Sequence, residues 1–531
     1  NCFVMDPTRH PYADAHDAWA DGVKSLDLAW QDSVLRRVAQ YDRGCSPRAS
    51  ADALRGFVRS ALLSFDDMQK QPERFFAAHR LLASRILGGF GIRFTVQYNL
   101  FAGSILGLGG DAQVAALAGM QRRGELGCFA LTEVGAGVLS GFIVNATAKW
   151  NARRGGFIIA TPDAASEKNW ISQGLTADWV VVFANLHDCE GKNHGPHPFL
   201  LRMRSGSSTD NDNVLDAGLT PGITVTDMGR KSIANDLDNA RIRFDGVFAP
   251  RNSLLNRFCE VTPDGAYRQI GQEKMRIEVI GQRLLTGRLA IAESALVSVR
   301  QLFLKAKKYA DNKPVNSATG PRPLSGLPHL HKLFCDADDE LTRLETFSSS
   351  VEARLCACLR SRTIPDANLV EAISVTKIRN IEMATHFEHQ LEQELGSYAL
   401  MAESGFIYKD MLLCCKFAEG DSRILLQKVA RDELRRVQKA GMFRLVWRML
   451  FDDDEFGRAK KAFWLGRALQ QAPSMAEGFV NEWEQVYSLA NAVCDHHLHH
   501  EKPDSKEVSR MLENNPHLLK LTVDPLLVSR L

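Results

Sequence analysis

Glu419 has the sequence surroundings of a carboxylate that could do acid–base chemistry. Apolar residues precede it at 411–413 and Phe417, and Gly420 follows it, which permits close approach of backbone to a ligand. In a dry site a carboxylate has a raised pKa and can remove a weakly acidic proton near neutral pH. A structural interpretation stays open, because the macrodipole also favours an acidic residue at a helix start. Asp421 or Ser422 can cap the helix that follows.

The densest group of potential metal ligands is Cys494-Asp495-His496-His497-Leu498-His499-His500. On a helix, His496 and His500 would share one face, as would Asp495 and His499. A divalent metal site is conceivable with these ligand types. We favour a solvated helix end, since ligand-type residues without supporting partners are common on surfaces.

The composition limits the classes of function. The chain has 531 residues, of which 45% are hydrophobic and 24% charged, as in soluble globular proteins with several structural units. The net charge of +2 gives no electrostatic case for nucleic acid or a membrane surface, and no apolar run reaches the roughly 18 residues of a membrane span. The eleven cysteines have no framework spacing, which predicts reduced thiols. The close pairs Cys356/Cys358 and Cys414/Cys415 cannot form a four-ligand site alone, so we predict no metal.

The periodicity changes twice along the chain. Residues 1–125 are helical in pattern, with apolar residues of 54–65 on one face. Residues 126–265 have strand patterns, including a hairpin of 147–150 with 157–159, and predict an antiparallel β domain. Further strand candidates are 142–144, 179–183, 199–203, 223–227 and 242–248.

Long helical patterns occupy the remainder of the chain. They are expected at 270–311, 329–360, 367–397 and 422–446, and the proline-rich 312–328 is expected to be a loop. We therefore predict an α+β, mainly α fold. Its parts are an N-terminal helical domain (1–125), a central antiparallel β domain (126–265), a long-helix bundle (266–440) and a shortened helical extension (441–531).

Several motifs together resemble those of the acyl-CoA oxidases, within the acyl-CoA dehydrogenase superfamily. They occur in the family's order, and the helical–β–helical organisation predicted from periodicity is that of the family. The motif that carries the resemblance most directly is Gly127-Cys128-Phe129-Ala130-Leu131-Thr132-Glu133-Val134-Gly135-Ala136-Gly137. The others lie at residues 72–76, 94–101, 168–172, 181–184, 197–199, 221–225 and 417–427.

The resemblance implies FAD as cofactor and names the residues of the site. Glu419 matches the catalytic base, whose backbone N–H, with a flavin hydroxyl, holds the thioester oxygen. Thr132 matches the residue that hydrogen-bonds the flavin ring, and Trp170 and Ser172 match strand residues that pack on it and bond to it. Gly137 of the first motif is implied beside the cofactor. Gly420 and Asp421 are implied beside the acyl-CoA substrate.

The chain departs from the family pattern at some cofactor positions. Val138 and Leu139 follow Gly137 where the family has Gly-x-Gly-Ser, and residues 309–314 replace a double-Arg motif that reaches the FAD pyrophosphate of the neighbouring subunit. Lys307, Lys308 or Lys313 could supply charge there without the bidentate fork of arginine.

The sequence thus predicts an FAD-dependent acyl-CoA oxidase of fatty-acid β-oxidation. It would convert acyl-CoA to trans-2-enoyl-CoA and pass electrons to molecular oxygen, giving hydrogen peroxide. The resemblance implies a homodimer, and the ending Ser529-Arg530-Leu531 resembles a peroxisomal address. Two alternatives stay open. One is a catalytically weak or inactive structural subunit of the same family, and the other is a dehydrogenase that uses an electron-transfer flavoprotein.

Overall fold

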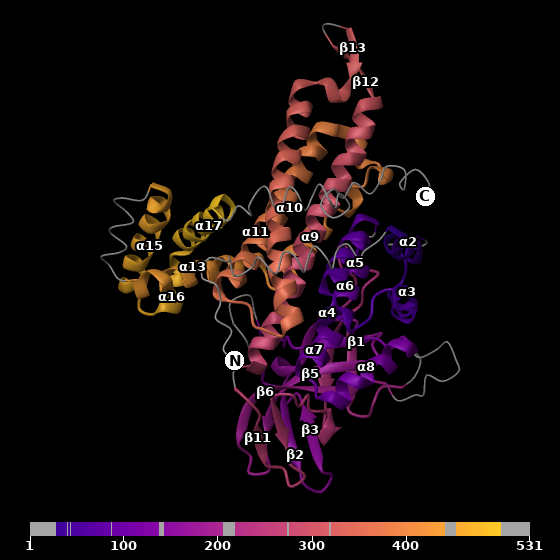
Figure 1. Cartoon of the computed structure of the whole chain (residues 1–531), viewed down its shortest axis with the longest axis vertical. Coiled ribbons are helices and arrows are strands. Elements are labelled where there is room, and N and C mark those ends of the chain that lie inside the picture. Colours follow the sequence, from indigo (N-terminus) through magenta and orange to yellow (C-terminus); the bar gives the residue numbers. More distant parts are fainter. Residues whose placement is uncertain are drawn as a thin grey trace, which may run out of the picture. The chain divides into compact units, whose positions relative to one another are not determined.

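The computed structural model describes residues 28–39, 41–42, 44–85, 88–136, 143–204, 218–272, 275–317, 320–440 and 453–500. They form two compact units (Figure 1). The β-containing unit comprises the described part of Asp17–Ala290 with Cys356–Ile364. The helical unit comprises Ile291–Leu355 with the described part of Pro365–Leu531. The mainly helical fold with a central β region confirms the predicted class, while the four domain boundaries stay a prediction.

Short helices precede the strands in the β-containing unit, where the sequence predicted helices. Ser46 caps α3 by accepting a hydrogen bond from the Ala49 N–H, and Pro47 occupies the first turn, where its missing N–H costs nothing. The helices are α2 (Leu28–Arg37), α3 (Pro47–Ser60), α4 (Asp67–Lys70), α5 (Pro72–Arg85), α6 (Gly89–Thr95), the π-helix η1 (Val96–Ala102), α7 (Gly103–Leu108) and α8 (Asp111–Arg123).

The strands of this unit form two larger sheets. One has the order β1-β5-β2-β3-β9 with β6 also paired to β5, and the other has the order β4-β8-β7. Their bounds are β1 (Gly127–Ala130), β2 (Thr147–Asn151), β3 (Gly156–Ala160), β4 (Lys168–Ser172), β5 (Trp179–His187), β6 (Asn193–Arg202), β7 (Ile223–Asp227), β8 (Asn239–Phe244) and β9 (Val247–Pro250), with a separate hairpin of β10 (Cys259–Val261) and β11 (Tyr267–Gln269).

The predicted β2–β3 hairpin is confirmed, but the expectation of a wholly antiparallel domain is wrong at β5. That strand pairs in parallel with β1 and with β2, whereas the other pairs are antiparallel. The chain between β1 and β5, and between β2 and β5, is long enough for the crossover that parallel pairing requires. Two strand positions also differ: 143–144 is irregular, and 242–248 is divided between β8 and β9.

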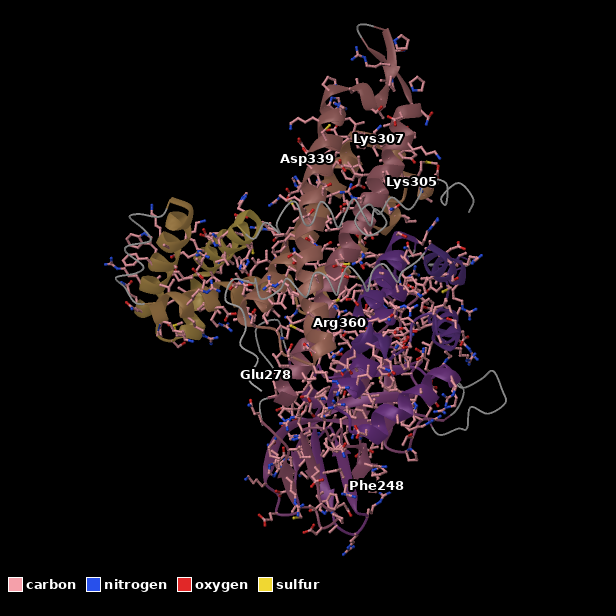
Figure 2. The ribbon with its side chains drawn as sticks, viewed as in Figure 1. Phe248, Glu278, Lys305, Lys307, Asp339 and Arg360 are labelled. Atoms are coloured by element: carbon pink, nitrogen blue, oxygen red, sulfur yellow. The ribbon has the colours of Figure 1, made fainter. Side chains whose placement is uncertain are left out.

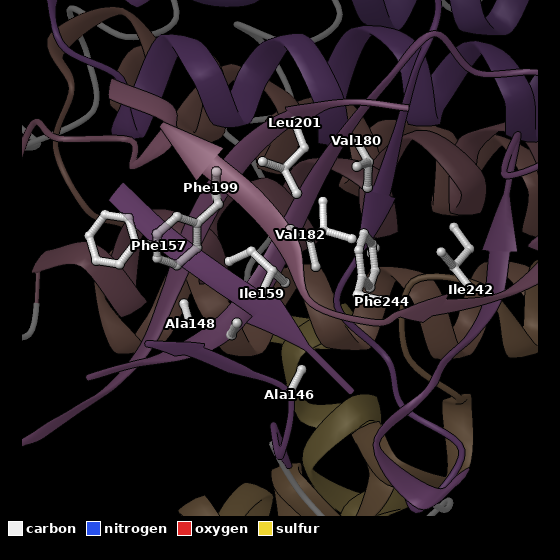
Figure 3. Packing of buried hydrophobic residues seen from close by; sticks show 14 of the residues in the cluster. Ala146, Ala148, Phe157, Ile159, Val180, Val182, Phe199, Leu201, Ile242 and Phe244 are labelled. Atoms are coloured by element: carbon white, nitrogen blue, oxygen red, sulfur yellow. The ribbon is translucent and has the colours of Figure 1, made fainter. Parts of the chain in front are cut away.

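A continuous apolar core holds this region together. Inward-facing residues of β2, β3, β5, β6 and β8 meet in it, and Figure 3 shows Phe157, Phe199 and Phe244 among the smaller aliphatic side chains. The rings of Phe157 and Phe199 pack edge to face with centroids 5.1 Å apart. This core includes Ile171 of β4, so the strand that carries Trp170 and Ser172 of the candidate site packs against it.

The helical unit contains the long helices expected from the sequence. Arg300 of α9 bonds to Glu345 of α10 at 2.6 Å, and Asn380 of α11 donates to Ser348 of α10 at 2.9 Å, so these three helices pack side by side (Figure 1). The bounds are α9 (Met275–Asn312, in this unit from Ile291), α10 (Pro328–Ser361, in this unit to Leu355), α11 (Ala367–Leu395), α12 (Met411–Phe417), α13 (Ser422–Ala440), α15 (Asp453–Gln471), α16 (Met475–Asn481) and α17 (Trp483–His500).

The proline-rich segment after α9 is more ordered than predicted. It contains a two-stranded hairpin of β12 (Pro314–Ser317) and β13 (Gly320–Pro323). Prolines are tolerated because each strand has one partner only and needs no N–H on its outer edge. Among the described helices, none combines the length and hydropathy of a membrane span.

Candidate functional site

Thr132 lies two residues after the end of β1, in the middle of the motif at residues 127–137. The Thr132 carbonyl accepts a hydrogen bond from the Asn169 N–H at 2.9 Å, which places Thr132 beside β4. Thr132 is exposed. The structure therefore brings Thr132 next to Trp170 and Ser172, although about forty residues separate them in the chain. Gly137 lies outside the described residues.

Trp170 is in an unusual backbone conformation. It lies where the register of β4 against β8 shifts between Lys168 and Ile171, with φ of 57° and 58% of its surface exposed. A bulky non-glycine residue at positive φ costs on the order of 1–3 kcal/mol and is held there by its surroundings. The bulge turns a large aromatic side chain outward instead of into the core, as bulges beside binding sites do. This geometry favours a ligand contact over the alternative of a core aromatic.

A buried ion pair anchors the same bulge. Lys168 Nζ bonds to Glu133 Oε1 at 2.7 Å, and both side chains are fully buried. Glu133 also accepts the Asn145 and Ala146 N–H groups at 2.7 and 3.0 Å. Burial lowers the pKa of Lys168 to about 8, while Glu133 opposes that shift. The sequence offered both residues inside family motifs but no sign that they pair.

Ser172 takes part in the sheet as well as facing the candidate site. It is paired with Asn239 of β8, whose Nδ2 donates to the Ser172 Oγ at 3.2 Å. The hydroxyl hydrogen can still donate to a ligand, because the Asn239 contact uses only an oxygen lone pair. An exposed aromatic ring with an exposed threonine and a half-buried serine on adjoining backbone suits the face and polar edge of a flavin.

Glu419 lies in the short connection between α12 and α13 of the helical unit. It has φ of 57°, although it is not glycine, and it is half-buried. The following Gly420 has φ of 97°, which only glycine adopts without cost. Two successive residues at positive φ make the sharp turn that separates the helices and set the direction of the Glu419 side chain.

The side chain of Lys377 in α11 stabilises this turn by hydrogen bonding. Its Nζ donates to the carbonyls of Ala418 and Gly420, the residues on either side of Glu419. Lys377 is fully buried. The sequence reasoning missed this residue, whose only signal was a lysine in the otherwise uncharged stretch 372–378.

Asp421 performs the capping role that the sequence proposed for it. Its Oδ1 accepts the Arg423 N–H at 2.7 Å, and its carbonyl accepts the Leu425 N–H at 3.1 Å. A carboxylate occupied in this way at the start of α13 stabilises the helix. Its proposed place beside the substrate is untested.

The end of α9 carries a basic hollow where the family has arginines. A cavity of about 390 Å³ is lined by Lys305, Lys308, Tyr309, Asn312, Lys313 and Tyr398. The rings of Tyr309 and Tyr398 are stacked with centroids 3.6 Å apart. Lys305 and Lys307 both project from this part of α9 (Figure 2), but Lys307 pairs with Asp311 at 2.8 Å. Lys308 and Lys313 line the cavity, and their compensating role stays a prediction.

The histidine cluster of α17 is engaged with α11. His497 Nε2 lies 2.7 Å from Glu371 Oε1, and Asp495 Oδ1 accepts from Arg379 at 2.8 Å. Within the described ranges no group of three or more histidine, cysteine or acidic side chains could hold a metal ion. These contacts make the cluster a helix-packing feature.

Known proteins with similar sequences are acyl-CoA oxidases. The chain is 27% identical over 386 residues to peroxisomal acyl-coenzyme A oxidase 3 of Homo sapiens, a match covering 69% of this chain and 53% of the relative. It is 27% identical over 438 residues to acyl-coenzyme A oxidase 2 of Arabidopsis thaliana, covering 74% and 58%. The chain thus spans about half the length of these relatives. No family model matches it.

Solved structures share the fold over nearly the whole chain. Acyl-CoA oxidase 1 of Yarrowia lipolytica matches with a TM-score of 0.69 at 18% identity, covering 97% of this chain and 81% of that one. Acyl-CoA oxidase-2 of Caenorhabditis elegans, solved with FAD, ascaroside-CoA and ATP, matches with a TM-score of 0.69 at 16% identity, covering 97% and 84%. In sequence the chain is thus similar to acyl-CoA oxidases, and its fold is that of acyl-CoA oxidases of known structure.

Proposed function

We propose that the protein is an FAD-dependent acyl-CoA oxidase that desaturates an acyl thioester between its α and β carbons. The observation that carries the proposal is Glu419, held at positive φ in the turn before α13 where the family has its catalytic base. Sequence similarity to acyl-CoA oxidases supports the reaction class, and the structural neighbour solved with FAD supports the cofactor.

In this proposal Glu419 removes the α-proton of the thioester. Exclusion of water by the bound substrate would raise the basicity of the carboxylate. The backbone N–H of Glu419 would donate to the thioester oxygen, where negative charge develops as the proton leaves. Gly420 leaves room for the substrate at the same turn.

Thr132, Trp170 and Ser172 would hold the cofactor. Trp170 offers a flat apolar surface to the ring system, and the hydroxyls of Thr132 and Ser172 offer donors to its polar edge. When bound, FAD supplies the hydride acceptor and the route of two electrons to oxygen, which yields hydrogen peroxide. Lys308 and Lys313 would attract the phosphates of the FAD held by the neighbouring subunit, as point charges in place of the absent arginines.

The test is a visible spectrum and a peroxide assay on the purified protein. FAD and a saturated straight-chain acyl-CoA are supplied, and the flavin absorption, enoyl-CoA and hydrogen peroxide are measured. We expect a flavin spectrum and equal amounts of enoyl-CoA and peroxide. Absence of both flavin binding and product would refute the proposal. Turnover only with an artificial electron acceptor would favour the dehydrogenase alternative.

A structural subunit without turnover is the second candidate. It is favoured by one specific observation, the lysines and stacked tyrosines at the end of α9 where the family has a double-Arg motif. It predicts no FAD binding at micromolar cofactor and a stable complex with another chain. Size-exclusion chromatography with and without FAD distinguishes this outcome from the homodimer proposed for the oxidase.

The peroxisome is the proposed location. The relative from Homo sapiens is named as peroxisomal. Ser529-Arg530-Leu531 lies outside the described residues, so its proposed role rests on the sequence alone. Microscopy of a fluorescent fusion, compared with the same fusion lacking these three residues, tests the role.

A further inference from the structure

We propose that Lys377 is a positioning residue whose ammonium group holds the Glu419 turn in its working conformation. The inference rests on the proposed function, because it gives Glu419 the role of base. It concerns α11 and the connection between α12 and α13, all within the helical unit.

One ammonium group, that of Lys377, donates hydrogen bonds to two backbone carbonyls. The Lys377 Nζ donates to the carbonyls of Ala418 and Gly420, so the backbone is restrained at the residue before Glu419 and at the residue after it. The residue between them has φ of 57°, a conformation that an L-residue leaves readily when nothing holds it. Restraining both neighbouring carbonyls removes the rotation by which Glu419 would return to negative φ.

The burial of Lys377 shows that the interaction is a built feature. Lysine is among the residues least often fully buried, because its ammonium loses strong hydration. Lys377 is nevertheless fully buried on α11, and carbonyl oxygens are what it receives in exchange for water. A neutral apolar residue would fill the helix interface equally well, so packing alone does not explain a cation at this position.

The consequence for chemistry is orientation. A base must point at its proton within hydrogen-bond reach, and a misplacement of about 1 Å can cost on the order of 100-fold in rate. The role proposed for Lys377 is exerted on the backbone, through the carbonyls of Ala418 and Gly420. It acts by holding the backbone from which the Glu419 carboxylate and N–H are presented.

The principal experiment compares Lys377→Met with Thr376→Val. Methionine has similar length and no donor. Thr376 is the adjacent buried residue, and its hydroxyl bonds only within its own helix to the Ala372 carbonyl at 2.9 Å among the contacts described. We measure kcat, KM for acyl-CoA, FAD content and melting temperature for both variants. We expect Lys377→Met to lose about 100-fold in kcat, with KM changed less than about threefold and FAD retained. Thr376→Val should keep kcat.

Chemical rescue separates positioning from a general structural role. In Lys377→Ala, ethylammonium at millimolar concentration should raise kcat at least about tenfold, because the cation can refill the space beneath the two carbonyls. Acetamide, which is neutral and only slightly larger, should not. Equal rescue by both, or wild-type kcat in Lys377→Met, would overturn the inference. If Lys377→Met does not fold, Lys377→Leu, which also lacks a donor, carries the same test with the same outcomes.

A readout without turnover keeps this inference distinct from the proposed function. Amide hydrogen exchange of residues 418–421 is measured in the wild type, Lys377→Met and Thr376→Val. Exchange at least about tenfold faster in Lys377→Met alone supports the positioning role even if the wild type proves inactive. Unchanged exchange overturns it. If the wild type is inactive but exchange is faster only in Lys377→Met, the oxidase function is refuted and the positioning role of Lys377 is still supported.

Discussion

Trp170 in the β-containing unit and Glu419 in the helical unit are both non-glycine residues at φ of 57°, but different contacts hold them. Trp170 lies in a strand bulge flanked by a ladder of backbone hydrogen bonds and by the buried Lys168–Glu133 pair. Glu419 lies in a turn between two helices, where the Lys377 ammonium bonds to the carbonyls on both sides.

The difference teaches where each half of the proposed chemistry is sensitive. A sheet distributes its constraint over many bonds, so no single side chain near Trp170 should control its conformation alone. A turn between helices has few backbone bonds of its own, so one cation can control it. Substitutions around Trp170 should therefore lower the stability of the fold, whereas substitutions around Glu419 should misalign the base and lower the rate.

The largest effect is expected from removing the base. Glu419→Gln keeps the shape of the side chain and abolishes its ability to take a proton, so kcat should fall by about 10²–10⁴-fold. FAD content and melting temperature should stay at wild-type values. The peroxide assay measures the rate, with the exposed Glu403→Gln as matched control. Normal turnover in Glu419→Gln would show that Glu419 is not the base, and the contrast between the two positions would then have no bearing on catalysis.

Breaking the ion pair beneath Trp170 should affect stability next. Lys168→Met leaves the Glu133 carboxylate buried without its cation, which should lower the free energy of unfolding by about 3–5 kcal/mol. Denaturant unfolding measures the change. Arg243→Ala, which disrupts an exposed pair with Asp245, should change it by less than about 1 kcal/mol. Rate loss in still-folded Lys168→Met would contradict the idea that this side fails by unfolding.

Trp170→Ala should separate binding from stability. The side chain is 58% exposed, so the free energy of unfolding should change by no more than about 0.5 kcal/mol. FAD affinity should fall by about tenfold, since a stacked aromatic contact is lost. Fluorescence titration with FAD measures this, and Trp464→Ala, also half exposed but on α15, should leave affinity unchanged. An equal loss of FAD affinity in both variants would show that Trp170 does not contact the cofactor.

A pH-dependent effect should appear at a second buried charge of α11. Burial raises the pKa of Glu388 to about 7, with Glu392 and Asp410 adding to the shift and Lys409 opposing it. A raised carboxyl pKa means that the fold is stabilised at low pH and loses that stability as pH rises through 7. Glu388→Gln should therefore match the wild type at pH 4 and be about 1–2 kcal/mol more stable at pH 8. The opposite pH dependence in denaturant titrations would exclude the assignment.

Much of the architecture was predictable because it depends on local pattern. The hairpin of β2 and β3 and the helices α9, α10, α11 and α13 follow from two-residue and 3.6-residue periods in the sequence. The parallel partners of β5 were not predictable, since pairing direction depends on how distant segments pack. The hairpin at 314–323 was missed because prolines indicate a loop equally well.

The candidate site divides in the same way. Sequence by itself proposed Glu419, Thr132, Trp170 and Ser172 as site residues through motifs, and predicted the Asp421 cap through local spacing. Only the tertiary structure decided that Trp170 lies in an exposed bulge and that Lys377 meets the carbonyls beside Glu419. A motif records which side chains are present, but a positive φ and a buried ammonium are maintained by contacts with residues far away in the chain, and no local pattern encodes such contacts.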